Sequence, residues 1–202
     1  MSLPISVYIA VSILLELLLL VLIIKLRYKK FTSRDFVLFY RRGLLRTKGY
    51  GGAYFLLPLI DQIIVLPTSV QRVNFEMTQQ IIFKPKFRKS SYDKKIDNII
   101  IKGFLLYKVK EPQEFYNYSR LADSFQSKDA KEEGNRLIKI TNEDLYDVIV
   151  GYLKRIVLEE PLDDLYTNRS NLLKKLQDHI QPNMNNHSME LVDMKILDIV
   201  LD

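Results

Sequence analysis

Residues 99–115 read IIIKGFLLYKVKEPQEF, and this stretch decides the fold. The part up to Val109 is apolar and rich in residues that favour a strand. Pro112 then occupies a favourable first-turn position, and from Phe115 through Tyr118 the apolar period changes from two to helical. A strand that runs directly into a proline-started helix predicts a domain of mixed α and β structure.

Short strands separated by turns are predicted before this stretch. Residues 34–41 alternate or run apolar with strand-favouring side chains, and the RRG sequence and the glycine pair 51–52 mark turns. Residues 53–67, AYFLLPLIDQIIVLP, predict two short apolar strands, and residues 69–77 predict a further one. These elements indicate a small antiparallel β region.

Helices dominate the part that follows. The polar residues 126–136 predict a linker, or a solvated helix interrupted by Gly134. Thr141 is the predicted N-cap of a helix with a wide apolar stripe. A second helix is predicted over residues 170–179, and residues 189–201 predict a closing strand.

An apolar run near the N-terminus predicts a membrane anchor. Residues 3–24 are apolar except for a proline, two serines and Glu16, and at about 1.5 Å per residue they span roughly 33 Å. A hairpin that dips into the bilayer and returns would need a Gly or Pro break, which residues 5–24 lack. An interfacial helix would need a charged face, and only Glu16 is charged. The sequence therefore favours a single crossing over these two alternatives.

The formal net charge of +6 is concentrated directly after this run. Residues 25–48 hold nine Lys and Arg against the single acid Asp35. Because a basic group near an anionic lipid surface gains roughly 1 kcal/mol, we predict anionic membrane lipids as partners. The bias of Lys and Arg toward the cytoplasmic side predicts a single-pass cell-membrane protein with its N-terminus outside and its domain in the cytoplasm. The predicted membrane-surface residues are Lys25, Arg27, Lys29, Lys30, Arg34, Arg41 and Arg42.

Residues 84–95, KPKFRKSSYDKK, form a second basic stretch and are predicted as a hairpin loop. Three interpretations stay open: a solvated turn, a second lipid contact, and a nucleic-acid patch with Phe87 and Tyr92 as stacking groups. Nucleic acid is the least favoured, because the membrane already explains the basic charge. The second lipid contact would use Lys84, Lys86, Arg88 and Lys89.

No group of residues in the sequence meets the requirements of a catalytic site. There are no cysteines, and His179 and His187 do not have a metal-ligand spacing. A phosphate-binding loop and a G-x-S-x-G nucleophile turn are both missing. We therefore expect no enzymatic activity, no cofactor and no metal. Arg155 and Arg169 are predicted to pair with nearby acids, either within the domain or across an oligomer interface.

Four stretches, at residues 51–67, 99–115, 148–176 and 189–199, resemble in their order and spacing the SPFH (band 7) domain family, and most of all flotillins and stomatins. The similarity covers residues 34–202. It implies an α+β fold in which an N-terminal transmembrane helix precedes a small antiparallel β region and a mixed α/β subdomain.

The domains expected from this resemblance are an anchor over residues 1–26, a β-rich first subdomain over 27–110 and a helical or mixed second subdomain over 111–202. The family implies a scaffold that oligomerises with copies of itself or with other SPFH chains on a membrane. Such a scaffold organises a lipid and protein microdomain, with membrane proteins or a membrane protease as clients.

One departure from the family pattern bears on assembly. SPFH proteins normally continue from the last strand into a long helical coiled-coil region, whereas this sequence stops at Asp202. The alternative function, from a different class, is a membrane-tethered module that recruits nucleic acid or an acidic protein through residues 84–95.

Overall fold

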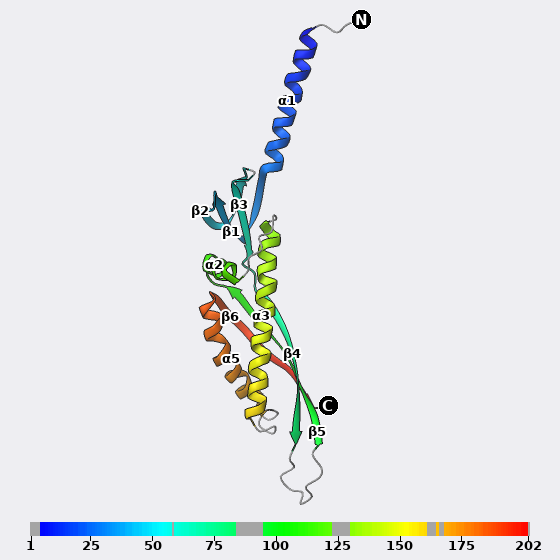
Figure 1. Ribbon diagram of the computed structural model, residues 1–202, viewed down its shortest axis with the longest axis vertical. Coiled ribbons are helices and arrows are strands. Elements are labelled where there is room, and N and C mark those ends of the chain that lie inside the picture. The colour runs from blue at the N-terminus through cyan, green and yellow to red at the C-terminus, as the bar shows by residue number, and fades with distance from the viewer. Residues whose placement is uncertain are drawn as a thin grey trace, which may run out of the picture. The chain divides into compact units, whose positions relative to one another are not determined.

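The computed structural model describes residues 5–57, 59–83, 95–122, 130–160, 165 and 168–201. In these residues four helices and six strands follow one another, which confirms the predicted α+β class (Figure 1). The chain forms two compact units. The first comprises residues 1–67 and 127–134, and the second comprises residues 68–126 and 135–202.

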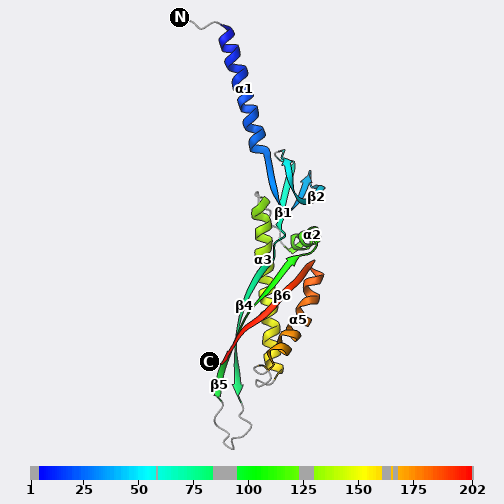
Figure 2. The same ribbon diagram turned by 180° about the vertical axis from the view of Figure 1, so that it is seen from behind.

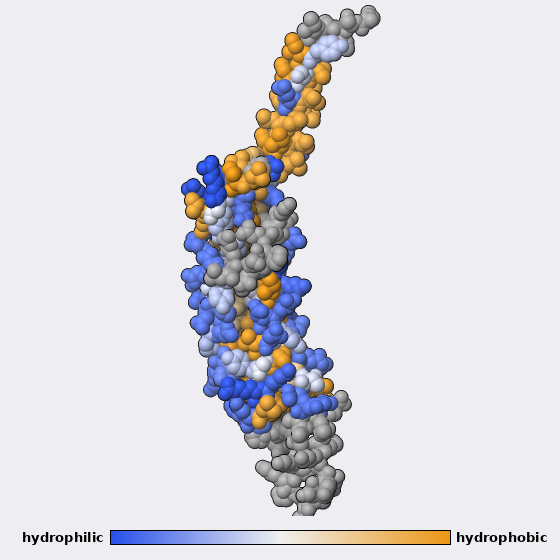
Figure 3. Space-filling model, in the orientation of Figure 1, coloured by the Kyte–Doolittle hydropathy of each residue, from blue (hydrophilic) through white to orange (hydrophobic). Residues whose placement is uncertain are grey.

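The first unit begins with helix α1, Ile5–Arg27. Its described side chains from Val11 to Leu26 are exposed, and the large ones are almost all apolar. Figure 3 shows this helix as an apolar surface with few hydrophilic breaks. Within the part of the chain that the structure describes, no helix is both long and apolar enough to cross a membrane. The single crossing predicted over residues 3–24 is therefore not confirmed.

Three antiparallel strands complete the first unit. Sheet A contains β1 (Tyr28–Arg41), β2 (Leu44–Phe55) and β3 (Asp61–Pro67) in the order β2-β1-β3. A small core of buried apolar side chains holds it together: Phe31, Val37, Phe39, Ile63 and Val65. Tyr54 packs against this core, with its ring stacked on Phe39 at 5.6 Å and tilted against Phe31 at 6.0 Å.

Sheet A bends where the β1–β2 register shifts. Phe31 pairs with Gly52 and Phe36 with Tyr50, so β1 carries extra residues between the two pairs. The glycine pair 51–52, predicted as a turn, lies instead within β2. Gly51 has a φ of +61°, and a Cβ atom there would lie 3.0 Å from the Thr32 backbone, so only glycine fits this bulge without strain. The prediction was wrong because a bulge needs the same glycine conformations as a turn.

Sheet B in the second unit contains β4 (Gln71–Phe83), β5 (Lys95–Val109) and β6 (Met189–Leu201), all antiparallel, with β5 in the centre. Burial alternates along the strands, as between buried Phe75 and exposed Glu76. Figures 1 and 2, seen from opposite sides, show helices α3 and α5 on the same face of this sheet. The predicted domain boundary at residues 110 and 111 falls inside this unit, because β5 and β6 are paired across it.

Helix α2, Pro112–Ala122, begins at the predicted proline. It buries Phe115 and Tyr116, whereas Tyr118 of the predicted stripe is half exposed. Helix α5, Arg169–Asn186, is longer than the predicted 170–179 and continues past Pro182, since Ile180 and Met184 on either side are fully buried.

Helix α3, Ala130–Glu159, corrects two predictions. Thr141 lies in its interior and is not an N-cap, because buried Leu137 and Ile138 extend the apolar stripe further toward the N-terminus. Gly134 does not interrupt the helix either. A Cβ atom at Gly134 would lie 1.8 Å from the carbonyl oxygen of Val65 in the same unit, so this glycine permits a close approach of helix and strand.

Candidate membrane-facing surface and binding cavity

The basic residues after α1 are placed by the junction of helix and sheet. Lys25 and Arg27 lie in the last turn of α1, and Lys29 and Lys30 follow as exposed residues at the start of β1. Cations are favourable at a helix C-terminus because they complement its partial negative charge. The structure therefore brings four of the predicted membrane-surface residues together around the end of the apolar helix.

Arg41 has a structural role that the sequence analysis did not predict. Its Nε donates to Asp61 Oδ1 at 2.7 Å and a terminal nitrogen donates to Oδ2 at 3.0 Å, in a bidentate pair between β1 and β3. The Asp61 side chain is fully buried, and the hydrogen bonds from Arg41 hold the pKa of Asp61 below its usual value. The Leu57 N–H adds a third bond to this carboxylate, at 2.9 Å. Because its charge is compensated, Arg41 is a weaker candidate for lipid contact than its neighbours.

Two turns of sheet A lie at the end of α1, although they are distant in sequence. The Leu56 N–H donates to the Arg27 carbonyl at 3.0 Å, which places the start of the β2–β3 turn beside the last residue of the helix. The Arg42 N–H donates to the Ile60 carbonyl at 2.7 Å, which joins the β1–β2 turn to the same place. Arg34, in contrast, lies in the bend of β1 between Phe31 and Phe36.

The β2–β3 turn presents apolar side chains to solvent. Here we use the name for Leu57 and Leu59, together with Phe55 at its start. Leu59 is fully exposed and has a φ of +69°, an uncommon conformation for a leucine. Leu57 is 37% exposed and Phe55 44%. Figure 3 shows apolar surface beside strongly hydrophilic surface where α1 joins the sheet.

A cavity of about 160 Å³ lies in the second unit between α2, α3 and the junction of α5 with β6. Its wall is mostly apolar, with Leu145 and Met189 among the lining residues. At its rim the rings of Tyr118 and His187 stack with centroids 4.0 Å apart. Burial lowers the pKa of His187, and the negative charge of Asp144 opposes that shift. His187 is therefore half buried, and not the surface residue that the sequence suggested.

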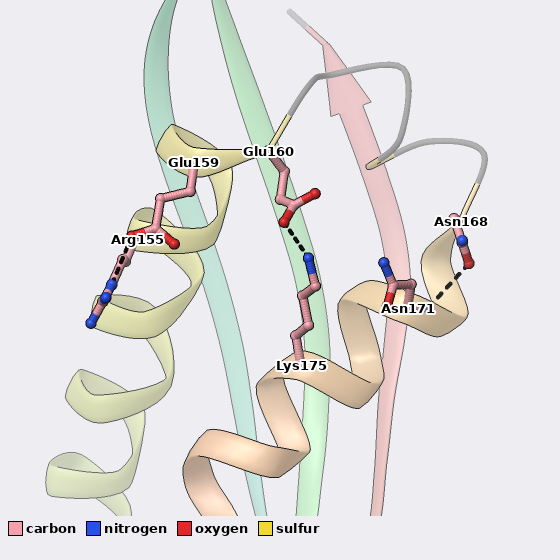
Figure 4. A network of polar contacts seen from close by, with 6 residues as sticks. All are labelled: Arg155, Glu159, Glu160, Asn168, Asn171 and Lys175. Carbon is pink, nitrogen blue, oxygen red and sulfur yellow. Dashed lines mark hydrogen bonds and ion pairs between the residues drawn. The ribbon is translucent and has the colours of Figure 1, made fainter.

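The predicted oligomer-interface residues lie near the end of α3 and the start of α5 (Figure 4). Arg155 donates to Glu159 one turn further along α3, at 2.9 Å, and both side chains are exposed. Lys175 of α5 forms an ion pair with Glu160. Asn168 caps α5 by accepting the Asn171 N–H at 3.2 Å.

These contacts show that Arg155 has a partner within its own helix. An exposed i,i+4 pair of this kind contributes only about 0.3–0.5 kcal/mol and leaves the side chains accessible to another chain. Arg169, the first residue of α5, is exposed. The structure thus keeps both arginines on the surface but does not bring them into one ion-pair network.

Two further predictions concern groups that the structure treats differently. Lys84, Lys86, Arg88 and Lys89 lie outside the described residues, so the second lipid contact stays a prediction. Among the residues that are described, no three His, Asp or Glu side chains are placed to hold a metal ion.

Sequence reasoning missed the β2–β3 turn and the cavity. The signal for the turn was present, because Leu57 and Leu59 flank a proline between two strands, where polar residues are usual. The cavity had no such signal, since its lining comes from four elements that only the fold brings together.

Comparison with known proteins agrees with this architecture. No curated protein matches the chain. The family model described as "SPFH domain / Band 7 family" matches residues 32–202, which is most of the chain and includes both sheets. The α+β protein described above, with its apolar helix joined to two small antiparallel sheets, belongs to the SPFH domain / Band 7 family.

Proposed function

We propose that this protein is a membrane scaffold that embeds α1 in the bilayer and assembles through its SPFH domain into a lipid and protein microdomain. Members of this family are commonly membrane-associated scaffolds of a generally non-catalytic type. The observation that carries the proposal is the direct junction of an apolar helix, with its described side chains exposed, to the family domain. A helix that is apolar on all sides is typical of a lipid or protein interior.

The orientation we propose places the N-terminus outside the cell and the SPFH domain against the inner leaflet. Lys25, Arg27, Lys29 and Lys30 gather at one end of α1, and Arg42 lies exposed in the turn that is bonded to Ile60. Each such basic group near an anionic surface contributes about 1 kcal/mol to binding, and Lys and Arg favour the cytoplasmic side. Protease protection of the domain in sealed inside-in vesicles would contradict a cytoplasmic domain if it failed.

Self-assembly has its own support in sheet B. Strand β6 is an edge strand of thirteen residues, and Val192, Leu197 and Val200 on it are exposed. An unpaired strand edge with apolar side chains is a surface at which a second chain can add. The exposed Arg155 and Arg169 lie on the two helices that cover the sheet, where they can meet acids of a neighbouring copy. A membrane protease or another membrane protein is the client that we propose for such an assembly.

The test is the mass and the negative-stain image of the protein extracted from its own membranes with a polymer. We expect a large closed particle, and we expect Leu197→Glu on the β6 edge to reduce it to smaller species. Leu158→Glu is the matched control, because Leu158 is also an exposed leucine but lies on α3. Monomers in native lipid would refute the scaffold.

A further inference from the structure

We propose that the β2–β3 turn enters the headgroup and upper acyl region of the same membrane as α1, as a second apolar contact. This inference rests on the proposed membrane association. Its basis is the fully exposed Leu59 with Leu57 and Phe55 beside it. Single exposed apolar residues are ordinary on a protein surface, whereas a cluster at the tip of a turn marks an interaction site.

The position of the turn selects lipid as the partner. The Leu56 N–H bonds to the carbonyl of Arg27, the last residue of α1, so the turn is fixed beside the end of the apolar helix. Tyr28 and Phe55 are also paired residues of β1 and β2. A membrane that surrounds α1 down to its last turn therefore reaches the β2–β3 turn as well.

The turn is held in shape before any membrane is present. Asp61 accepts the Leu57 N–H through its carboxylate at 2.9 Å and donates its own N–H to the Leu57 carbonyl at 3.2 Å. Arg41 in turn fixes that carboxylate from β1. Leu59 keeps its left-handed φ and its exposure on this rigid base, so its insertion needs little additional ordering. Arg41 is thus a residue that positions the turn and does not itself touch the lipid.

The charges around the turn favour anionic lipid. Arg27 and Arg42 are bonded through their backbones to the two ends of the turn, and Lys29 follows on β1. Apolar tips rimmed by Lys and Arg are typical of surfaces that lie in the interface of an anionic membrane. A second protein would have to bind beside α1 at the membrane surface, which makes it the less favoured occupant.

Fluorescence depth measurement tests this proposal on the full chain. Because the protein has no cysteine, a single introduced cysteine carries an environment-sensitive label alone. The test variant is Leu59→Cys and the control is Ser33→Cys, in the bend of β1, which at about 3.3 Å per strand residue lies up to roughly 20 Å along the strand from Arg27. Both are reconstituted in vesicles of zwitterionic and anionic phospholipid that contain lipids with quenchers near the headgroup.

We expect the label at residue 59 to lose most of its fluorescence to the lipid quencher and to resist aqueous iodide, with the reverse at residue 33. Loss of the lipid quenching at residue 59 in vesicles without anionic lipid would further support the basic rim. If both labels are open to iodide while the protein floats with the vesicles, the turn does not insert, and the proposed membrane scaffold still stands. Protection of residue 59 from both quenchers would indicate a protein occupant and overturn the inference. Failure of the protein to float with vesicles would refute the membrane association itself.

Discussion

Replacement of Gly134 by alanine tests the close approach of α3 to β3. In a helix interior alanine is normally better than glycine by about 1 kcal/mol, so propensity alone predicts a more stable protein. The structure predicts the opposite sign, because the new Cβ would lie 1.8 Å from the Val65 carbonyl oxygen and 2.9 Å from its carbon. Carbon and oxygen normally approach to about 3.3–3.6 Å, so the helix and the strand would have to separate by about 1.5 Å.

The separation is costly because both partners are backbone, and neither can rotate away. Overpacking of this kind typically costs about 1–3 kcal/mol, and here we expect the upper end, a net loss of about 2 kcal/mol after the propensity gain. Urea unfolding of the detergent-solubilised protein gives the magnitude, and hydrogen exchange at the amides of β3 gives the place. The control is Gly151→Ala in the same helix, where a Cβ meets nothing within 4 Å, and a gain of about 0.5–1 kcal/mol is expected. If Gly134→Ala stabilises the protein as Gly151→Ala does, the reasoning is refuted.

Two further variants test the second unit. His187 has a lowered pKa in the folded protein, so as the pH falls below its usual value of 6.5 the unfolded chain takes up the proton first and stability declines. Asp144→Asn removes the charge that opposes this shift and should steepen the decline in a thermal unfolding series from neutral to acid pH, whereas His187→Asn should flatten it. Tyr107→Phe should cost about 1–2 kcal/mol in urea unfolding, because the fully buried hydroxyl donates to Asn142 Oδ1 at 2.8 Å and that oxygen would lose its partner. An equal loss from the exposed control Tyr50→Phe would contradict this explanation.

Much of the fold could be predicted from local patterns. The strand that ends at Val109, the helix that begins at Pro112 and the closing strand from Met189 all follow from periodicity and from the fixed φ of proline. The start of α3 could not be predicted in this way, because Thr141 has the residue type of an N-cap but lies in a helix that buried side chains before it extend. A cap residue indicates where a helix can begin, and packing decides whether it does.

The candidate site depends on an effect that no local pattern contains. Lys25 to Lys30 could be assigned to the membrane surface because they directly follow an apolar run. Arg41 and Arg42 look equivalent to them in sequence, yet the bend of sheet A gives Arg41 a buried carboxylate partner and brings Arg42 to the Ile60 carbonyl.

The same bend explains why the exposed leucines of the β2–β3 turn are located beside α1. Strand β1 leaves the helix at Tyr28, and its two halves pair with β2 on either side of the register shift. The backbone bonds of Leu56 to Arg27 and of Arg42 to Ile60 can form together only if the later half of β1 returns toward its start. A face made from residues 27, 42, 57 and 59 therefore exists only in the folded sheet. Substitutions that straighten the Gly51 bulge should consequently disturb membrane contact even though they lie far from the lipid, because they would separate the turns that form this face.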